Sequence, residues 1–276
     1  MSDLKPYFNN IEAFGNYPVD PTGFTYAFSR LPQLGEIFSG LSLAETAGDG
    51  DTLMKARRVM QWVADYTTYD GASPLGPARP GKIIKFAIEE KKPINCANRA
   101  ILFCDALVSL GIFALPVNLQ HRPYLPAESR LDDSCHSHVI AQVWLPERGW
   151  WAAFDPSFNT YFTDSAGDPV SIPAMLRMQR TDDKARSVDN LTGEPTENGA
   201  LCTQIGLFDV SVFPGNDFTY RYHWDELVFL VPRAYLDIVA KSAPDDGWEV
   251  WHNRLLNSRK ISMADLEGEP RWVDCV

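Results

Sequence analysis

Three side chains in this sequence have the types and the order that catalysis by a thiol nucleophile requires: Cys96, His138 and Asp155. The reactive form of cysteine is the thiolate, which a helix N-terminus favours through its unpaired N–H groups and the positive end of its dipole. Those N–H groups, including that of Cys96, can bind the oxyanion formed when the sulfur attacks a carbonyl. A histidine can then move the proton while a carboxylate orients the imidazole.

Cys96 stands where a helix is expected to begin. The stretch KKPINCANRAILFCDALVSLG, residues 91–111, passes from a charged run through a proline into an apolar periodic segment. At 100° per residue, one side of this helix carries Cys96 and four apolar residues, and the opposite side carries polar residues including Asn98 and Asp105. We predict an amphipathic core helix that begins at Cys96, on its buried side, and ends at Gly111 before a strand.

His138 and Asp155 lie on HVIAQVWLPERGWWAAFDP, two apolar runs around a Pro/Gly turn that together predict a β-hairpin. If the loop has an even number of residues, Val143 lies opposite Ala152. His138 is then one diagonal step from Asp155 and projects from the same face of the sheet. Asp155 would hold one imidazole nitrogen while the other points at the cysteine.

Each of these residues also has an ordinary structural explanation. A cysteine on an apolar helix face is usually a packing residue, which is our interpretation of Cys104. A histidine at a strand start is usually solvated or hydrogen-bonded, and an aspartate before proline usually forms a turn. The case for chemistry therefore depends on the combination.

Two other sites are alternatives. Cys135, His136 and His138 could ligate a metal, but adjacent residues of an extended chain point to opposite sides, and no distant ligand pair has a recognisable spacing. We therefore expect no metal and no cofactor. Cys135 is a second candidate nucleophile, although no helix terminus is expected there to activate it.

The remaining segments are expected to surround this centre. Helices are predicted over 51–70, capped by Asp51 or Thr52 and with Tyr66 on the apolar face, and over 82–90. Residues 1–50 are expected to be irregular, and 205–231 to add strands to the sheet. The long polar loop at 120–136 is a candidate binding loop, and 189–200 is expected to be a mobile loop.

Composition limits the classes of partner. With 45% hydrophobic residues, the chain of 276 residues can bury an ordinary core. A net charge of −11 argues against a nucleic-acid partner. The N-terminal residues resemble neither a secretory signal nor a transit peptide, and no apolar run is long enough to span a membrane. Five cysteines without a disulfide spacing fit reduced thiols, so we expect a cytoplasmic protein.

The ordered segments resemble the transglutaminase-like superfamily, distant relatives of papain-type cysteine peptidases. The resemblance runs from about residue 50 to 160, through INCANRAILFCDALVSLGIFALPV and HVIAQVWLPERGWWAAFDPS. It implies an α+β, papain-like fold in which a helix with an N-terminal cysteine packs on an antiparallel sheet. It also implies that Cys96 is the nucleophile, His138 the base and Asp155 the orienting acid. Asn95 stands where family members often have glycine, which leaves the upstream oxyanion partner open.

The resemblance implies cysteine-dependent acyl transfer at an amide or peptide bond through a thioester, with hydrolysis slightly favoured. The substrate would be a peptide, a protein or a small amide. Transfer to an amine acceptor and a non-catalytic scaffold on the same fold are the alternatives. We expect a single domain over 1–276, with a catalytic core at about 50–160, an N-terminal extension at 1–50 and a C-terminal elaboration at 161–276.

Overall fold

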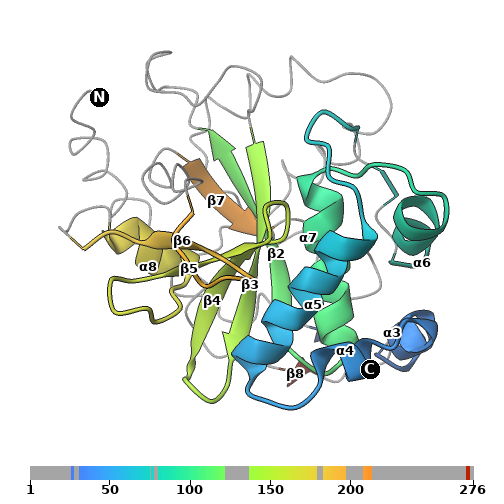
Figure 1. Cartoon of the computed structure of the whole chain (residues 1–276), viewed down its shortest axis with the longest axis horizontal. Coiled ribbons are helices and arrows are strands. Elements are labelled where there is room, and N and C mark those ends of the chain that lie inside the picture. Colours follow the sequence, from blue (N-terminus) through green and yellow to red (C-terminus); the bar gives the residue numbers. More distant parts are fainter. Residues whose placement is uncertain are drawn as a thin grey trace.

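The protein is described by a computed structural model in which an antiparallel β-sheet forms the centre (Figure 1). The structure describes residues 26–27, 31–74, 76–77, 80–121, 137–178, 183–196, 208–212 and 272–273. Within them, six strands pair in the order β6-β5-β4-β3-β2-β7. Their bounds are β2 Ala114–His121, β3 Ser137–Leu145, β4 Trp150–Asp155, β5 Thr160–Thr163, β6 Arg186–Asp189 and β7 Phe208–Val212. Separately, β1 (Tyr26–Ala27) pairs in parallel with β8 (Trp272–Val273).

Helices cover the sheet and one another. Their bounds are α3 Leu31–Phe38, η2 Ser39–Leu41, α4 Leu43–Ala47, α5 Thr52–Tyr66, α6 Pro80–Ile83, the π-helical η3 Ile84–Glu89, α7 Cys96–Ser109 and α8 Ile172–Met178. Helix α7 contacts β2 and β3, and α3, α5 and α6 contact α7 (Figure 1). The predicted α+β fold, a helix with an N-terminal cysteine on an antiparallel sheet, is confirmed.

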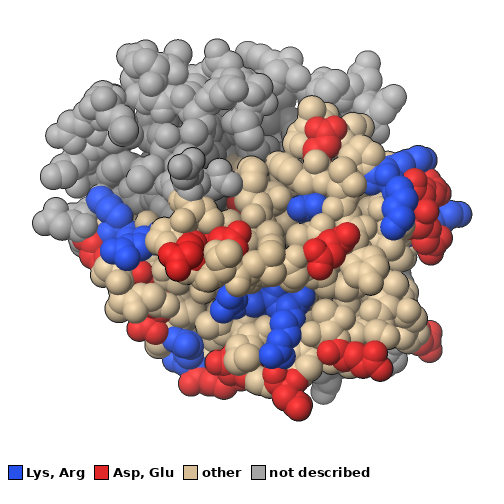
Figure 2. Space-filling model, viewed as in Figure 1, with Lys and Arg blue, Asp and Glu red and all other residues tan. Residues whose placement is uncertain are grey.

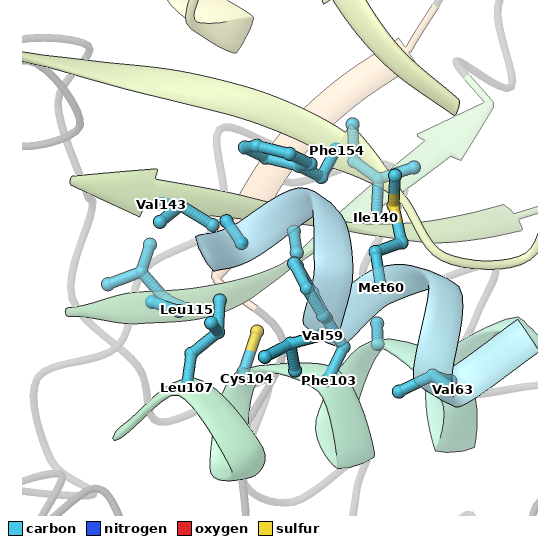
Figure 3. Close-up of a cluster of buried hydrophobic side chains, with 14 of the residues drawn as sticks. Val59, Met60, Val63, Phe103, Cys104, Leu107, Leu115, Ile140, Val143 and Phe154 are labelled. Atoms are coloured by element: carbon cyan, nitrogen blue, oxygen red, sulfur yellow. The ribbon is translucent and has the colours of Figure 1, made fainter. Parts of the chain in front are cut away.

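The core lies between α5, α7 and the sheet. Val59 and Met60 of α5, Phe103 of α7 and Phe154 of β4 converge there (Figure 3). The rings of Phe103 and Phe154 have centroids 5.7 Å apart, and all four side chains are fully buried. Each such side chain stabilises the fold by about 1.5–3 kcal/mol through burial. This packing fixes α7 against the sheet along its length.

The prediction that α7 is amphipathic is wrong. Asn98 and Asp105, expected on an outer polar side, are both fully buried, and the helix is buried all round from Ala97 to Val108. The sheet covers one side of α7 and three other helices contact it as well. A helix enclosed by several elements has no solvent face, and periodicity in one sequence does not reveal how many neighbours it has.

The hairpin register is confirmed. Val143 pairs with Ala152 across β3 and β4, so the turn between the strands has an even number of residues, 146–149. Glu147 of this turn also accepts hydrogen bonds from the backbone N–H of Thr52, 3.0 Å, and from its hydroxyl, 2.8 Å. The tip of the hairpin is thereby fixed to the start of α5.

Helix α5 begins as predicted and differs at its end. The side chain of Asp51 accepts a hydrogen bond from Met54 N at 2.8 Å, which confirms it as the N-cap. Tyr66, expected on the buried face, is 50% exposed and contacts Trp62 instead, with ring centroids 5.6 Å apart. Tyr66 is the last residue of the helix, where the neighbouring elements no longer cover that face.

One further expectation needs correction, and three elements were not predicted. Residues 31–47, expected to be irregular, contain the α-helices α3 and α4 and the short 3-10 helix η2, and in α3 Leu34 and Phe38 are buried one turn apart. This apolar pattern spans only one turn around Gly35, so its period is too short to predict a helix. Strands β5 and β6 and helix α8 were not predicted. Of the loop expected at 189–200, the structure describes residues 189–196, in which Pro195 is bridged to Val188.

Strand β7 confirms the predicted strands only over 208–212. The remainder of 205–231 and most of the predicted binding loop lie outside the described residues. The proposed domain limits stay a prediction. On the face shown in Figure 2, acidic and basic side chains of the described residues lie among one another.

Candidate active site

Cys96 is the first residue of α7, as the sequence predicted. Asn95 is the N-cap: its backbone is extended, and its side chain accepts a hydrogen bond from Asn98 N at 3.1 Å. The thiol is half-buried, in contact with the core on one side. It therefore lies at the end of the helix where N–H groups lack partners within the helix.

Two asparagines fasten a neighbouring loop over this helix start. Asn95 Nδ2 donates to Ser73 O at 3.2 Å, and Asn98 Nδ2 donates to Pro77 O at 3.0 Å. Asn98 Oδ1 accepts from Gly76 N at 2.9 Å. A Cβ at Gly76 would lie 3.2 Å from Asn98 Oδ1, so the loop approaches closely because it has glycine there. The buried amide of Asn98 thus has partners on both of its polar atoms.

His138 and Asp155 meet as the hairpin register predicted. His138 Nε2 and Asp155 Oδ2 are 2.8 Å apart, and both side chains are buried. The second carboxylate oxygen, Asp155 Oδ1, accepts from Ser157 N at 3.0 Å. The carboxylate is therefore held at two points, and its orientation fixes that of the imidazole.

The side chain of Cys96 lies close enough to the imidazole of His138 to contribute to its raised pKa. Because Nε2 is engaged with Asp155, Nδ1 is the ring nitrogen available to the sulfur. Burial by itself lowers the pKa of His138, but the charge and hydrogen bond of Asp155, with smaller contributions from Cys96, raise that pKa well above its ordinary value. Such an imidazole keeps its proton and can stabilise a neighbouring thiolate.

Arg99, which was not predicted from the sequence to belong to the site, stabilises the backbone around Cys96 and Asp155. It is buried one turn after Cys96, and its Nη1 donates to Pro156 O at 3.2 Å and to Ser157 O at 3.0 Å. Its Nη2 donates to Thr67 O at 2.6 Å. Burial lowers the pKa of Arg99, and Tyr69 and Asp155 offset part of this shift. Arg99 is the only basic residue of α7, and this charge in a largely apolar helix was the signal in the sequence that could have identified it.

Two aromatic residues near the triad were also missed. Phe158 and His138 have ring centroids 5.8 Å apart, and Phe158 and Tyr69 have centroids 5.6 Å apart in an edge-to-face arrangement. Trp144 and Trp151 lie elsewhere, as buried partners close to the hairpin turn. An aromatic residue three positions after Asp155 was the available signal.

The other candidates cannot be placed. Cys135 and His136 lie outside the described residues. In the segments that the structure describes, no three histidine, cysteine or acidic side chains gather as a metal site would require. Over the same segments, no helix is both long and apolar enough to cross a membrane.

Residues 41–156 match the family model described as the transglutaminase-like superfamily. This segment of the chain is similar to that superfamily. It contains Cys96, His138 and Asp155, and the resemblance stated from the sequence is confirmed. The roles of the three residues in catalysis stay a prediction.

Several solved structures are similar to parts of this chain. A proposed cysteine protease from Cytophaga hutchinsonii is 14% identical to this chain, with a TM-score of 0.32. The match covers 57% of this chain and 43% of that protein. A TGase is 20% identical, with a TM-score of 0.30, and the match covers 56% of this chain and 37% of that protein. A proposed protease from Parabacteroides distasonis is 13% identical, with a TM-score of 0.29, and the match covers 62% of this chain and 31% of that protein. The matches span less than half the length of each of these proteins, and no curated protein matches the sequence.

Proposed function

We propose that the protein catalyses acyl transfer at an amide or peptide bond through a thioester on Cys96, with water as the favoured acceptor. The observation that carries the proposal is the contact of His138 Nε2 with the buried carboxylate of Asp155, 2.8 Å, beside the thiol at the start of α7, which also raises the pKa of His138. A nucleophile, a proton-transfer group and an orienting acid in contact form the arrangement that covalent catalysis requires.

In the first step, the thiolate of Cys96 attacks the carbonyl carbon, and the carbonyl oxygen becomes an oxyanion beside the N–H groups at the start of α7. His138, protonated because Asp155 raises its pKa, donates that proton to the leaving nitrogen as the C–N bond breaks. The products are a free amine and an acyl thioester on Cys96.

In the second step, His138 accepts a proton from water as the water oxygen attacks the thioester. The C–S bond breaks, the carboxylic acid leaves, and the thiolate–imidazolium pair is restored. An amine that reached the thioester instead of water would give a new amide, so hydrolysis and transfer share one intermediate. The superfamily match supports this chemistry as a class.

The test is the intact mass of the protein after brief incubation with a set of peptide and small amide substrates. We expect a mass increase equal to an acyl group, located on the peptide that contains Cys96. Cys96→Ala should form no adduct, while Cys104→Ala should form it as the wild type does. Adding a primary amine shows whether the acyl group passes to amine or to water.

A wild-type protein that hydrolyses an amide while Cys96→Ala does so equally fast would refute the proposal. A folded protein that forms no adduct with any of the substrates would favour the non-catalytic scaffold.

A further inference from the structure

Phe158 is an exposed aromatic side chain directly beside the proposed catalytic histidine. It keeps 46% of its surface exposed, whereas most large hydrophobic side chains in the described segments are buried. Its ring contacts the imidazole of His138 on one side and Tyr69 on another. An apolar surface at a reaction centre can bind part of a substrate.

The position of Phe158 indicates which part of the substrate it would meet. The substrate carbonyl must lie against the sulfur of Cys96, and the departing nitrogen must lie against the imidazole that gives it a proton. Phe158 contacts the imidazole. The group attached to the amine nitrogen therefore passes over Phe158, and an amine entering in the reverse direction takes the same position.

The backbone around Phe158 is held on both sides. Before it, Arg99 binds the carbonyl groups of Pro156 and Ser157. After it, Asn159 has a positive φ of 54°, its Nδ2 donates to Gln61 Oε1 at 2.7 Å, and its carbonyl accepts from Asn190 N at 3.0 Å. A ring on a fixed backbone presents its face without a large entropic cost on binding.

The positive charge of Arg99, beside the pair of Phe158 and Tyr69, disfavours the binding of a cationic substrate group on these rings. The guanidinium carbon of Arg99 lies 5.4 Å from the centroid of the Tyr69 ring, so a cation already occupies one side of this pair. A second positive group on the same aromatic surface would be repelled, whereas an uncharged ring or alkyl group would pack on it.

We propose that Phe158, supported by Tyr69, binds an aromatic or other apolar group carried by the amine nitrogen of the scissile amide. This assignment rests on the proposed acyl transfer at Cys96. The preferred substrates are then amides of hydrophobic amines, such as a peptide bond followed by an apolar residue.

A binding measurement tests this surface without turnover. In a Cys96→Ala background, N-(2-phenylethyl)acetamide and N-ethylacetamide are titrated while the imidazole NMR signals of His138 are followed. The two probes share the acyl group and differ in the amine substituent. We expect the phenylethyl amide to bind more tightly, and Phe158→Ala to reduce this preference about three- to tenfold.

Two variants serve as controls. Phe158→Leu keeps an apolar group and should retain part of the preference. Trp150→Ala removes a similarly exposed ring, 40% exposed, from the opposite end of β4 and should leave the preference unchanged. Circular dichroism spectra of all variants show whether the fold is intact.

A kinetic measurement tests the link to the reaction. Ethyl thioacetate acetylates Cys96 with release of ethanethiol, which takes its proton from His138. The acetyl group is then offered to 2-phenylethylamine or to ethylamine, whose nitrogen gives up a proton as the C–S bond breaks. Comparing the product ratio between the wild type and Phe158→Ala cancels the difference in amine basicity. We expect the ratio of N-(2-phenylethyl)acetamide to N-ethylacetamide to be lower in the variant.

The outcomes separate the two proposals. If binding preference and product ratio are unchanged in Phe158→Ala while Cys96 is acetylated, the aromatic surface is refuted and the proposed function stands. If Cys96 is never acetylated while binding preference depends on Phe158, the surface stands as a binding site and the proposed function fails.

Discussion

Helix α7 carries two cysteines in contrasting surroundings. Cys96, at its start, is half-buried and contributes to the raised pKa of His138. Cys104, in its middle, is completely buried, and burial, with the nearby charge of Asp105, raises the pKa of its thiol well above the ordinary value. One residue type on one helix thus has the surroundings of a nucleophile at one position and those of a packing group at the other.

The two regions are also stabilised differently. Around Cys104, apolar side chains of α5, α7 and the sheet fill the space (Figure 3). Around Cys96, the helix start depends on directed hydrogen bonds from Asn95, Asn98 and Arg99 to loop backbone. Apolar packing tolerates small changes in direction, whereas a site built on hydrogen bonds requires its partners at fixed positions.

The largest expected effect is on thiol reactivity. Iodoacetamide should modify Cys96 in the folded protein at least about a thousandfold faster than Cys104, since Cys104 is reached only when the core opens. Peptide mass spectrometry at increasing times measures both rates. Comparable rates at the two positions would contradict the contrast, and equal rates in denaturant provide the control.

Replacing Arg99 should give the next largest effect. Arg99→Met removes charged hydrogen bonds to three backbone carbonyls and should lower the free energy of unfolding by about 3 kcal/mol. Arg99→Lys keeps the charge, but its ammonium group cannot reproduce the planar guanidinium contacts, so it should recover only part of the loss. Urea unfolding of both variants measures this. A loss below about 0.5 kcal/mol for Arg99→Met would show that the bonds are not needed for stability.

Removing the buried thiol should have a smaller effect that depends on pH. Cys104→Ala should cost about 1–2 kcal/mol at neutral pH because it leaves a small cavity. The raised pKa of Cys104 in the folded state means that its contribution is complete below about pH 8.5 and is lost as the pH rises toward the folded value. The difference between wild type and variant should therefore shrink above about pH 8.5. A constant difference up to pH 10 would contradict this account.

The smallest expected effect concerns His138, whose pKa is raised in the folded protein. Its imidazolium stabilises the fold fully below about pH 6.5, and this contribution disappears as the pH rises through the higher folded pKa. Asp155→Asn should lower that pKa, and Cys96→Ala should lower it by less, since Asp155 makes the larger contribution. NMR titration of the imidazole signals gives both values. If Cys96→Ala lowered the pKa of His138 more than Asp155→Asn did, the thiol and not the carboxylate would have the main influence on that pKa.

Much of the site could be predicted from local patterns. The proline before Cys96 and the apolar periodic run after it indicated a helix start, and an even number of residues in the hairpin loop set the register that brings His138 next to Asp155. These features depend on neighbours within one helix or one hairpin. Arg99 and Phe158 escaped prediction because their partners, Thr67 and Tyr69, are distant in the sequence.

The sequence by itself determined where α7 begins, which residues share a face of the hairpin, and that a thiol, an imidazole and a carboxylate follow in that order. Only the tertiary structure decided that α7 is enclosed on all sides, that Arg99 joins three segments and that Phe158 stays exposed beside His138. Periodicity records which residues of one element share a face. It does not record how many other elements cover that face, and this number determines whether a polar side chain becomes a solvated group, a buried brace or part of a reactive site.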